Sequence, residues 1–142
     1  MENRDRKMIT VASTINLPVN KVWRYWTNPD DIVRWNKASD DWHTTSARND
    51  LRTGGKFYSR MEAKDGSAGF DFEGTYESVK PNEELIYIIG DGRKVKVFFK
   101  SQGNATWVSE SFETEEINSA EMQRGGWQSI LNNFKKYSES KG

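Results

Sequence analysis

The sequence predicts an α+β domain in which a seven-stranded antiparallel sheet wraps around a long C-terminal helix, with two short helices between strands one and two. Three observations support this fold. Alternating residues open the chain, turn dipeptides recur at hairpin spacing through its middle, and an apolar stripe with helical spacing closes it. The 142 residues suffice for one core, so we expect residues 1–142 to form a single domain, ordered over about 8–139 with flexible charged ends.

The first strand and the two short helices are predicted from residues 8–35. Residues 8–17 alternate between apolar and polar side chains, as in a half-buried strand. Pro18 suits the first turn of a helix, where its missing N–H costs nothing, and an apolar stripe carries that helix to about Thr27. Asn28 followed by Pro29 resembles an N-cap and first helical position, so a second helix is expected as far as Trp35.

Turn signals divide the middle of the chain into six further strands. They are Gly54-Gly55, Asp65-Gly66, Pro81-Asn82, Asp91-Gly92 and Gly103-Asn104. Asp-Gly supplies the positive φ angles of a tight hairpin turn. The predicted strands run over about 42–47, 56–63, 68–79, 84–90, 94–101 and 106–114.

The last element is predicted to be a helix capped by Asn118 or Ser119, with Glu121 completing a capping box behind Asn118. Its apolar stripe consists of Gln123, Trp127, Ile130, Leu131, Phe134 and Tyr137 or Ser138, and ends near Glu139. At about 1.5 Å per residue this helix crosses the whole sheet. Gly125-Gly126 costs a helix about 1 kcal/mol per glycine, so we expect a strand or ligand to approach closely there.

Composition excludes several classes of function. The formal net charge is +0, which argues against a general nucleic-acid binder, since such a protein needs a positive field. Cysteine is absent and there is one histidine, so we expect no metal site and no cofactor. The N-terminus has no apolar signal region and no run is long enough to span a membrane, so a cytoplasmic protein is expected.

The aromatic supply is large for so polar a chain, with six Trp, seven Phe and five Tyr. On the predicted strands the apolar phases agree, because Phe57, Met61, Phe70 and Phe72 all fall on the face toward the helix. We therefore predict a ligand pocket lined by Trp26, Trp35, Phe57, Ser59, Met61, Phe70, Phe72, Tyr76, Glu110, Trp127, Ile130, Leu131 and Phe134. The alternative is that these residues simply fill the core.

Two ionisable residues are considered as catalytic groups. Glu110 is in phase with Val108 and Phe112, so a regular strand would point it inward with a raised pKa, as an acid or base. We favour a salt bridge at the rim of the sheet or a bulge that turns it outward. His43 has no partner for a metal site or triad, and an ordinary strand or loop histidine is the favoured interpretation.

Several motifs resemble one known protein group. They are Leu17-Pro18-Val19, Thr27-Asn28-Pro29-Asp30, Trp35-Asn36, Gly54-Gly55-Lys56-Phe57, residues 60–66, residues 69–76 and Gly126-Trp127. In order and spacing the chain resembles the helix-grip fold of the START-like (SRPBCC) superfamily. Within it, the sequence is similar to the group of the C-terminal domain of the activator of heat-shock protein 90 ATPase. The resemblance implies a cavity with an unknown ligand, and it brings a chaperone partner and a stress-response role into consideration.

Three functions are compatible with the sequence. The first is binding of a small apolar, lipid-like or aromatic molecule between sheet and helix, favoured because no catalytic set is complete. The second is a cyclase-like or hydrolytic enzyme in which Tyr76, His43 or Glu110 moves a proton. The third is binding of a chaperone partner, ranked lower because the chain has no room for the activator's additional chaperone-binding domain.

Overall fold

The computed structural model describes residues 7–142 and confirms the predicted α+β architecture. The expectation of a flexible charged N-terminus falls on residues 1–6, outside the described part of the chain. The elements are β1 (Met8–Ile15), α1 (Val19–Thr27), α2 (Pro29–Trp35), β2 (Trp42–Asn49), β3 (Lys56–Ala63), β4 (Gly69–Lys80), β5 (Glu84–Ile89), β6 (Lys94–Gln102), β7 (Ala105–Glu113) and α3 (Ala120–Lys141).

The seven strands form one antiparallel sheet with the order β1-β7-β6-β5-β4-β3-β2. Every hairpin in this order joins neighbours in sequence, and β1 pairs with the last strand. The turns rely on the residues that tolerate positive φ, including Gly92 in the β5–β6 turn and Asn82 in the β4–β5 turn. Bulges interrupt the ladder near Thr44 in β2 and between Tyr76 and Ser78 in β4, where a bulge increases the bend of a sheet.

Local sequence signals place the short helices close to their predicted bounds. The side-chain oxygen of Asn28 accepts a hydrogen bond from the backbone N–H of Asp30 at 3.0 Å and caps α2. Pro18 sits at the N-cap of α1 rather than in its first turn, so that helix starts one residue later than predicted. The two helices are consecutive and connect β1 to β2 at one end of the sheet.

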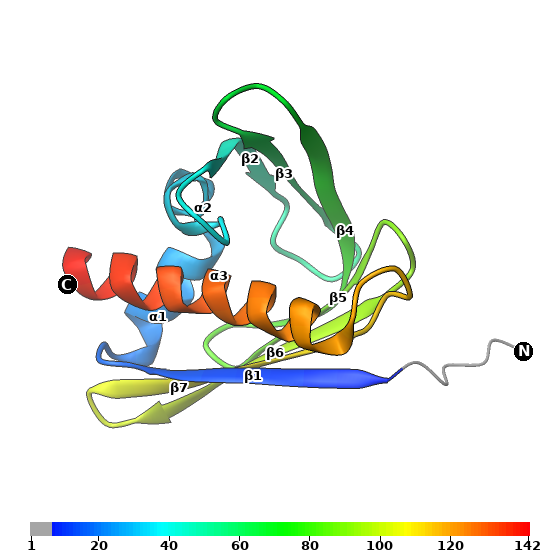
Figure 1. The fold of residues 1–142 in the computed structure, drawn as a ribbon. Coiled ribbons are helices and arrows are strands. Elements are labelled where there is room, and N and C mark those ends of the chain that lie inside the picture. The colour runs from blue at the N-terminus through cyan, green and yellow to red at the C-terminus, as the bar shows by residue number, and fades with distance from the viewer. Residues whose placement is uncertain (1–6) are drawn as a thin grey trace, which may run out of the picture.

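Helix α3 lies along β1 and covers its free edge (Figure 1). Successive side chains of α3 bind the backbone of this edge strand. Arg124, Gln128 and Lys135 donate to the carbonyls of Thr10, Ala12 and Thr14, and Glu139 accepts from the N–H of Asn16. Two residues of a strand and four residues of a helix both span about 6 Å along their axes. Contacts spaced by four residues on α3 therefore match carbonyls spaced by two residues on β1.

The remaining strands are not covered in the same way. In Figure 1, β2, β3 and β4 curl away from β1 and rise above α3, with α2 close to one end of them. We call these three strands the outer wing. The outer wing therefore lies on the far side of α3 from β1.

The cap of α3 is one of the two residues predicted for it. The hydroxyl of Ser119, not Asn118, accepts the capping hydrogen bond from the N–H of Met122, at 3.2 Å. The side chain of Gln123 does not belong to an apolar stripe, because it bonds the backbone of Glu115 and Asn118 and so holds the preceding loop. The helix continues to Lys141.

The expected close approach of a strand at Gly125-Gly126 is wrong. A Cβ atom built on either glycine would meet no other atom within 4 Å, and neither glycine has a positive φ. Packing in the described structure therefore does not require glycine at these positions.

Candidate functional site: a pocket between the outer wing and the helices

A pocket of about 280 Å³ lies in the space between the outer wing, the middle of the sheet and the helices. Its wall contains residues from all three helices and from strands β2, β3, β4, β5 and β7. The lining residues are Trp26, Ile32, Trp35, Asn36, Arg48, Asn49, Phe57, Ser59, Met61, Phe70, Phe72, Tyr76, Leu85, Tyr87, Arg93, Glu110, Trp127 and Ile130.

Most of the residues that the sequence places at the ligand site border this pocket. Eleven of the thirteen do so: Trp26, Trp35, Phe57, Ser59, Met61, Phe70, Phe72, Tyr76, Glu110, Trp127 and Ile130. Leu131 and Phe134 do not. Both are fully buried in the core, where the ring of Phe134 meets those of Trp26 and Trp35 at centroid distances of 4.8 and 5.0 Å. Leu131 and Phe134 therefore fill the core, as the alternative to a ligand site predicted.

Aromatic rings form the sheet side of the wall. The ring of Phe57 contacts those of Phe72, Tyr76 and Tyr87, with centroids 5.6, 5.4 and 4.8 Å away. Ring edges and faces that meet at these distances hold one another in fixed orientations. Phe70 differs from these residues, because it is 49% exposed and its ring contacts that of Trp42 at the rim of the pocket. The pocket thus has a rigid aromatic floor and an apolar rim.

On the opposite side, α3 contributes Trp127, whose ring stacks on that of Phe112 with a centroid distance of 4.3 Å and an angle of 10° between the planes. Phe112 is fully buried in β7, so the stack fixes the tryptophan against the sheet. Trp35 from α2 is fixed by its indole N–H, which donates to the carbonyl of Tyr25 at 2.9 Å.

Tyr76 is less available to a ligand than its inward direction suggests. Its hydroxyl donates to the side-chain oxygen of Asn49 at 2.7 Å, and the amide nitrogen of Asn49 donates to the carbonyl of Thr27, also at 2.7 Å. This chain of bonds joins β4, the end of β2 and the end of α1. Burial raises the pKa of Tyr76 far above its usual range, so the hydroxyl stays protonated.

Glu110 points into the pocket, and the favoured expectation of a rim salt bridge or outward bulge is wrong. The ladder between β7 and its neighbours is regular at this residue, with Val11 and Val97 directly opposite it. Both valines are buried, and Glu110 itself is only 5% exposed. Removal from water in these apolar surroundings raises the pKa of Glu110 from 4.5 to about 8. The carboxyl group has no hydrogen bond or ion pair with any described residue, and its oxygen atoms are accessible from the pocket.

Two hydroxyl groups that border the same pocket as Glu110 are also without a partner. Ser59 on β3 and Tyr87 on β5 are buried and border the pocket, and within residues 7–142 neither hydroxyl has a hydrogen-bond partner. Burial, with smaller contributions from Glu110 and Tyr76, raises the pKa of Tyr87. The pocket therefore combines an apolar wall with three polar groups that are free to bind a ligand, the arrangement typical of small-molecule sites.

His43 is not part of this site. His43 is on β2 and pairs with Glu62 on β3, which shares the outward face of that strand with Arg60 and Tyr58. The next residue, Thr44, is buried and pairs with Met61 on the pocket side. The enzyme hypothesis loses one of its three proton-transfer groups for this reason. Among the described residues there is also no cluster of three or more His, Asp or Glu side chains that could hold a metal ion.

The sequence reasoning missed seven lining residues. They are Ile32, Asn36, Arg48, Asn49, Leu85, Tyr87 and Arg93. Apolar residues occupy both faces of β5, so the alternation of polar and apolar residues could not show that Leu85 and Tyr87 point inward. Arg48 and Asn49 lie beyond the predicted end of β2, which continues past the bulge. Nothing in the sequence around Asn49 indicates that its side chain bonds both Tyr76 in β4 and Thr27 in α1.

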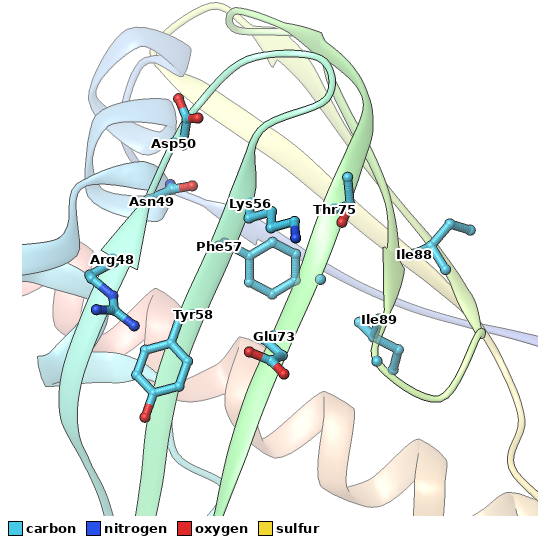
Figure 2. Close-up of a pocket in the computed structure, with 12 residues that line it drawn as sticks. Arg48, Asn49, Asp50, Lys56, Phe57, Tyr58, Glu73, Thr75, Ile88 and Ile89 are labelled. Carbon is cyan, nitrogen blue, oxygen red and sulfur yellow. The ribbon is translucent and has the colours of Figure 1, made fainter.

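A second hollow, of about 920 Å³, lies over the strands of the outer wing and β5 (Figure 2). Its lining includes the charged side chains of Arg48, Lys56 and Glu73, and Ile89 is its only buried residue. Arg48 is already placed over the ring of Tyr58, 4.7 Å from its centre. This wide, charged surface lacks the convergent walls of the smaller pocket, which we therefore take as the candidate site.

No helix in the described part of the chain has the length and apolar character needed to cross a membrane.

The chain is similar to several proteins of known structure. The family described as Activator of Hsp90 ATPase homolog 1-like protein matches residues 16–139. An AHSA1-like protein from Aeromonas hydrophila is 47% identical over 96% of this chain and 94% of its own, with a TM-score of 0.90. A protein from Cytophaga hutchinsonii is 50% identical over 94% and 92% of the two chains, with a TM-score of 0.81.

The fold is also found at low identity. A protein from Nitrosomonas europaea is 20% identical over 95% of this chain and 96% of its own, with a TM-score of 0.81. None of the curated proteins compared with the chain matches it. The family match spans most of the sequence, and the sheet grips α3 as in the START-like helix-grip fold. The chain therefore belongs to the family of Activator of Hsp90 ATPase homolog 1-like proteins.

Proposed function

We propose that this protein binds a small, largely apolar molecule in the pocket between the outer wing and α3. The observation that carries the proposal is a wall of fixed aromatic rings facing three buried polar groups that have no partner within the described residues. A pocket that served only packing would be filled by its own side chains. The oxygen atoms of the three groups are accessible from the pocket, where a ligand can reach them.

The volume of the pocket limits the ligand. About 280 Å³ is just below the usual range for ligand sites, roughly 300–1,000 Å³, and equals the volume of about nine water molecules. A molecule of about ten non-hydrogen atoms fits this space. Such a ligand binds in roughly the micromolar to millimolar range, given the free energy available per atom. Sterols and long fatty acids are larger than the pocket as it stands.

The test is a titration of ¹⁵N-labelled protein with a panel of bicyclic aromatic compounds and medium-chain fatty acids, read as amide chemical shifts. We expect saturable shifts at Trp127, Phe72 and their neighbours. Ser59→Leu fills the pocket from β3 and should abolish them. Ser46→Leu places the same side chain on an exposed position of β2 and should leave them unchanged.

Two outcomes would contradict the proposal. One is a wild-type protein that shows no saturable shifts across the panel. The other is a set of shifts that persists in Ser59→Leu, since binding would then occur elsewhere. Folding of Ser59→Leu is checked from the spread of its amide resonances before titration.

A second candidate, binding of a chaperone partner, is supported by the family description and by two exposed aromatic side chains. Phe98 and Trp107 are each 37% exposed on the outer face of β6 and β7. This function predicts that the protein alters ATP turnover by the host's heat-shock protein 90 homologue, and that Trp107→Ala removes the effect while Ser59→Leu retains it. No change in turnover and no co-elution with the chaperone would exclude it.

A further inference from the structure

Glu110 is the most unusual side chain of the pocket. It is 5% exposed, it faces the pocket, and it forms no hydrogen bond or ion pair with the part of the chain that the structure describes. Its oxygen atoms are accessible from the pocket, where they can meet water or a ligand, and the apolar surroundings favour the neutral acid over the carboxylate. The regular ladder around it, with Val11 and Val97 opposite, fixes the direction of the side chain toward the pocket.

The surroundings show which ligand this carboxyl group can accept. Arg48 from β2 and Arg93 from the turn before β6 border the same pocket, and arginine keeps its positive charge over the working pH range. Tyr76 from β4 and Tyr87 from β5 are the other ionisable groups, and both stay protonated. The three helices contribute only tryptophan, isoleucine and asparagine side chains, β3 contributes none that ionises, and the neighbours of Glu110 on β1 and β6 are valines.

These neighbours disfavour a charged ligand. A cation would face two guanidinium groups, and it would bind well only to an ionised Glu110, which the apolar wall opposes. Arg93 already pairs with Asp91 at 2.8 Å, and Arg48 lies over the ring of Tyr58, so an anion would have to compete with existing contacts of both arginines. A neutral carboxylic acid, in contrast, offers one O–H donor with no change of charge.

We propose that Glu110, as a protonated acid, donates a hydrogen bond to a carbonyl-type oxygen of a small, uncharged, mostly apolar ligand. The inference rests on the proposed function and names the chemical class of the ligand. Its geometric basis is the unpartnered carboxyl group of Glu110 in the wall of an aromatic pocket of about 280 Å³. At neutral pH the carboxyl group is in the required form, since burial raises its pKa to about 8.

Three compounds of nearly identical shape test this inference: indane, 1-indanone and 1-aminoindane. They share one bicyclic frame and differ in having no polar group, a carbonyl oxygen or a cationic amine. Binding is measured by amide shifts or tryptophan fluorescence at pH 6 and pH 9 (pH 6 and 8 for the amine). The readout is the ratio of the Kd of indane to that of 1-indanone, in which the contribution of the shared apolar frame cancels.

We expect 1-indanone to bind wild-type protein about three- to tenfold more tightly than indane at pH 6, the range for one net hydrogen bond. At pH 9 about nine-tenths of Glu110 is ionised and offers no donor, so the ratio should fall to one or below. Glu110→Leu should give a ratio near one at both pH values.

Glu110→Gln should keep most of the preference at both pH values, because the amide retains an N–H donor and does not ionise. Glu73→Gln, the same substitution on an exposed position of β4, should behave as wild type. A ratio near one in the wild type at pH 6, or a preference that survives in Glu110→Leu, would overturn the inference.

A stronger binding of 1-aminoindane that grows between pH 6 and pH 8 would also overturn it, since the carboxylate would then be recognising a cation. If indane and 1-indanone bind equally, only the hydrogen-bond assignment fails. If none of the three compounds reaches saturation, the proposed function itself fails. The wild-type ratio at the two pH values decides the question even if a variant does not fold.

Discussion

Glu110 should make the stability of this protein fall as the pH rises through the neutral range. The pKa of its carboxyl group is 4.5 in ordinary surroundings and about 8 in the folded protein, so the folded state binds more protons than the unfolded state between these values. The contribution of Glu110 to stability is then most favourable below pH 4.5 and falls as the pH rises toward 8. The difference amounts to about 2 kcal/mol between pH 6 and pH 8, a large part of a typical domain stability of about 5–15 kcal/mol.

Urea unfolding followed by tryptophan fluorescence at pH 6, 7 and 8 measures this effect. The midpoint for the wild type should decrease by about 1 M over this range, since m is about 1–3 kcal/mol/M. Glu110→Gln carries no charge at this position, so the difference between the two proteins isolates Glu110 from His43 and from every other titrating group. Equal slopes with pH in the two proteins would show that Glu110 is solvated or paired and would refute the reasoning.

Three other substitutions have effects of defined sign on unfolding by urea. Gly125→Ala should stabilise the protein by about 0.5–1 kcal/mol, because the site is helical and has open space around it. Gly74→Ala should destabilise it by about 1–3 kcal/mol, since the new Cβ would lie 2.5 Å from the carbonyl of Ile88 and 2.7 Å from the ring of Phe57. Phe134→Ala should cost about 3–5 kcal/mol, because this ring is fully buried, and a smaller loss would mean that the core collapses around it.

The elements of the fold were predictable because each rests on local chemistry. Asn28 caps a helix through its own side chain, and Gly92 supplies the positive φ of its hairpin. The inward phases of β3 and β4 follow from simple alternation, and the observed register pairs Phe57 with Gly74 and Met61 with Phe70. The boundaries were less certain, since the bulge in β2 lets that strand continue to Asn49.

The site was only partly predictable because its shape depends on contacts between distant elements. The bonds from Tyr76 to Asn49 and from Asn49 to Thr27 join segments that are 27 and 22 residues apart, and alternation carries no information about them. The direction of Glu110 was visible in its phase, but the general rule that carboxylates avoid the interior pointed the other way. The rule fails here because the regular ladder between β1, β7 and β6 fixes the direction of the side chain.

The position of α3 explains why such a carboxyl group can exist in this fold. Polar side chains of the helix bind the backbone of the edge strand β1, so the helix is held at that end of the sheet rather than pressed onto the outer wing. The pocket that remains reaches Glu110 in β7, and its carboxyl oxygen atoms can meet a ligand there. A leucine at this position would remove a cost that grows to about 5 kcal/mol when the group is fully ionised. An apolar side chain would therefore stabilise the fold more than Glu110 does. The carboxyl group is instead suited to bind a ligand in the pocket.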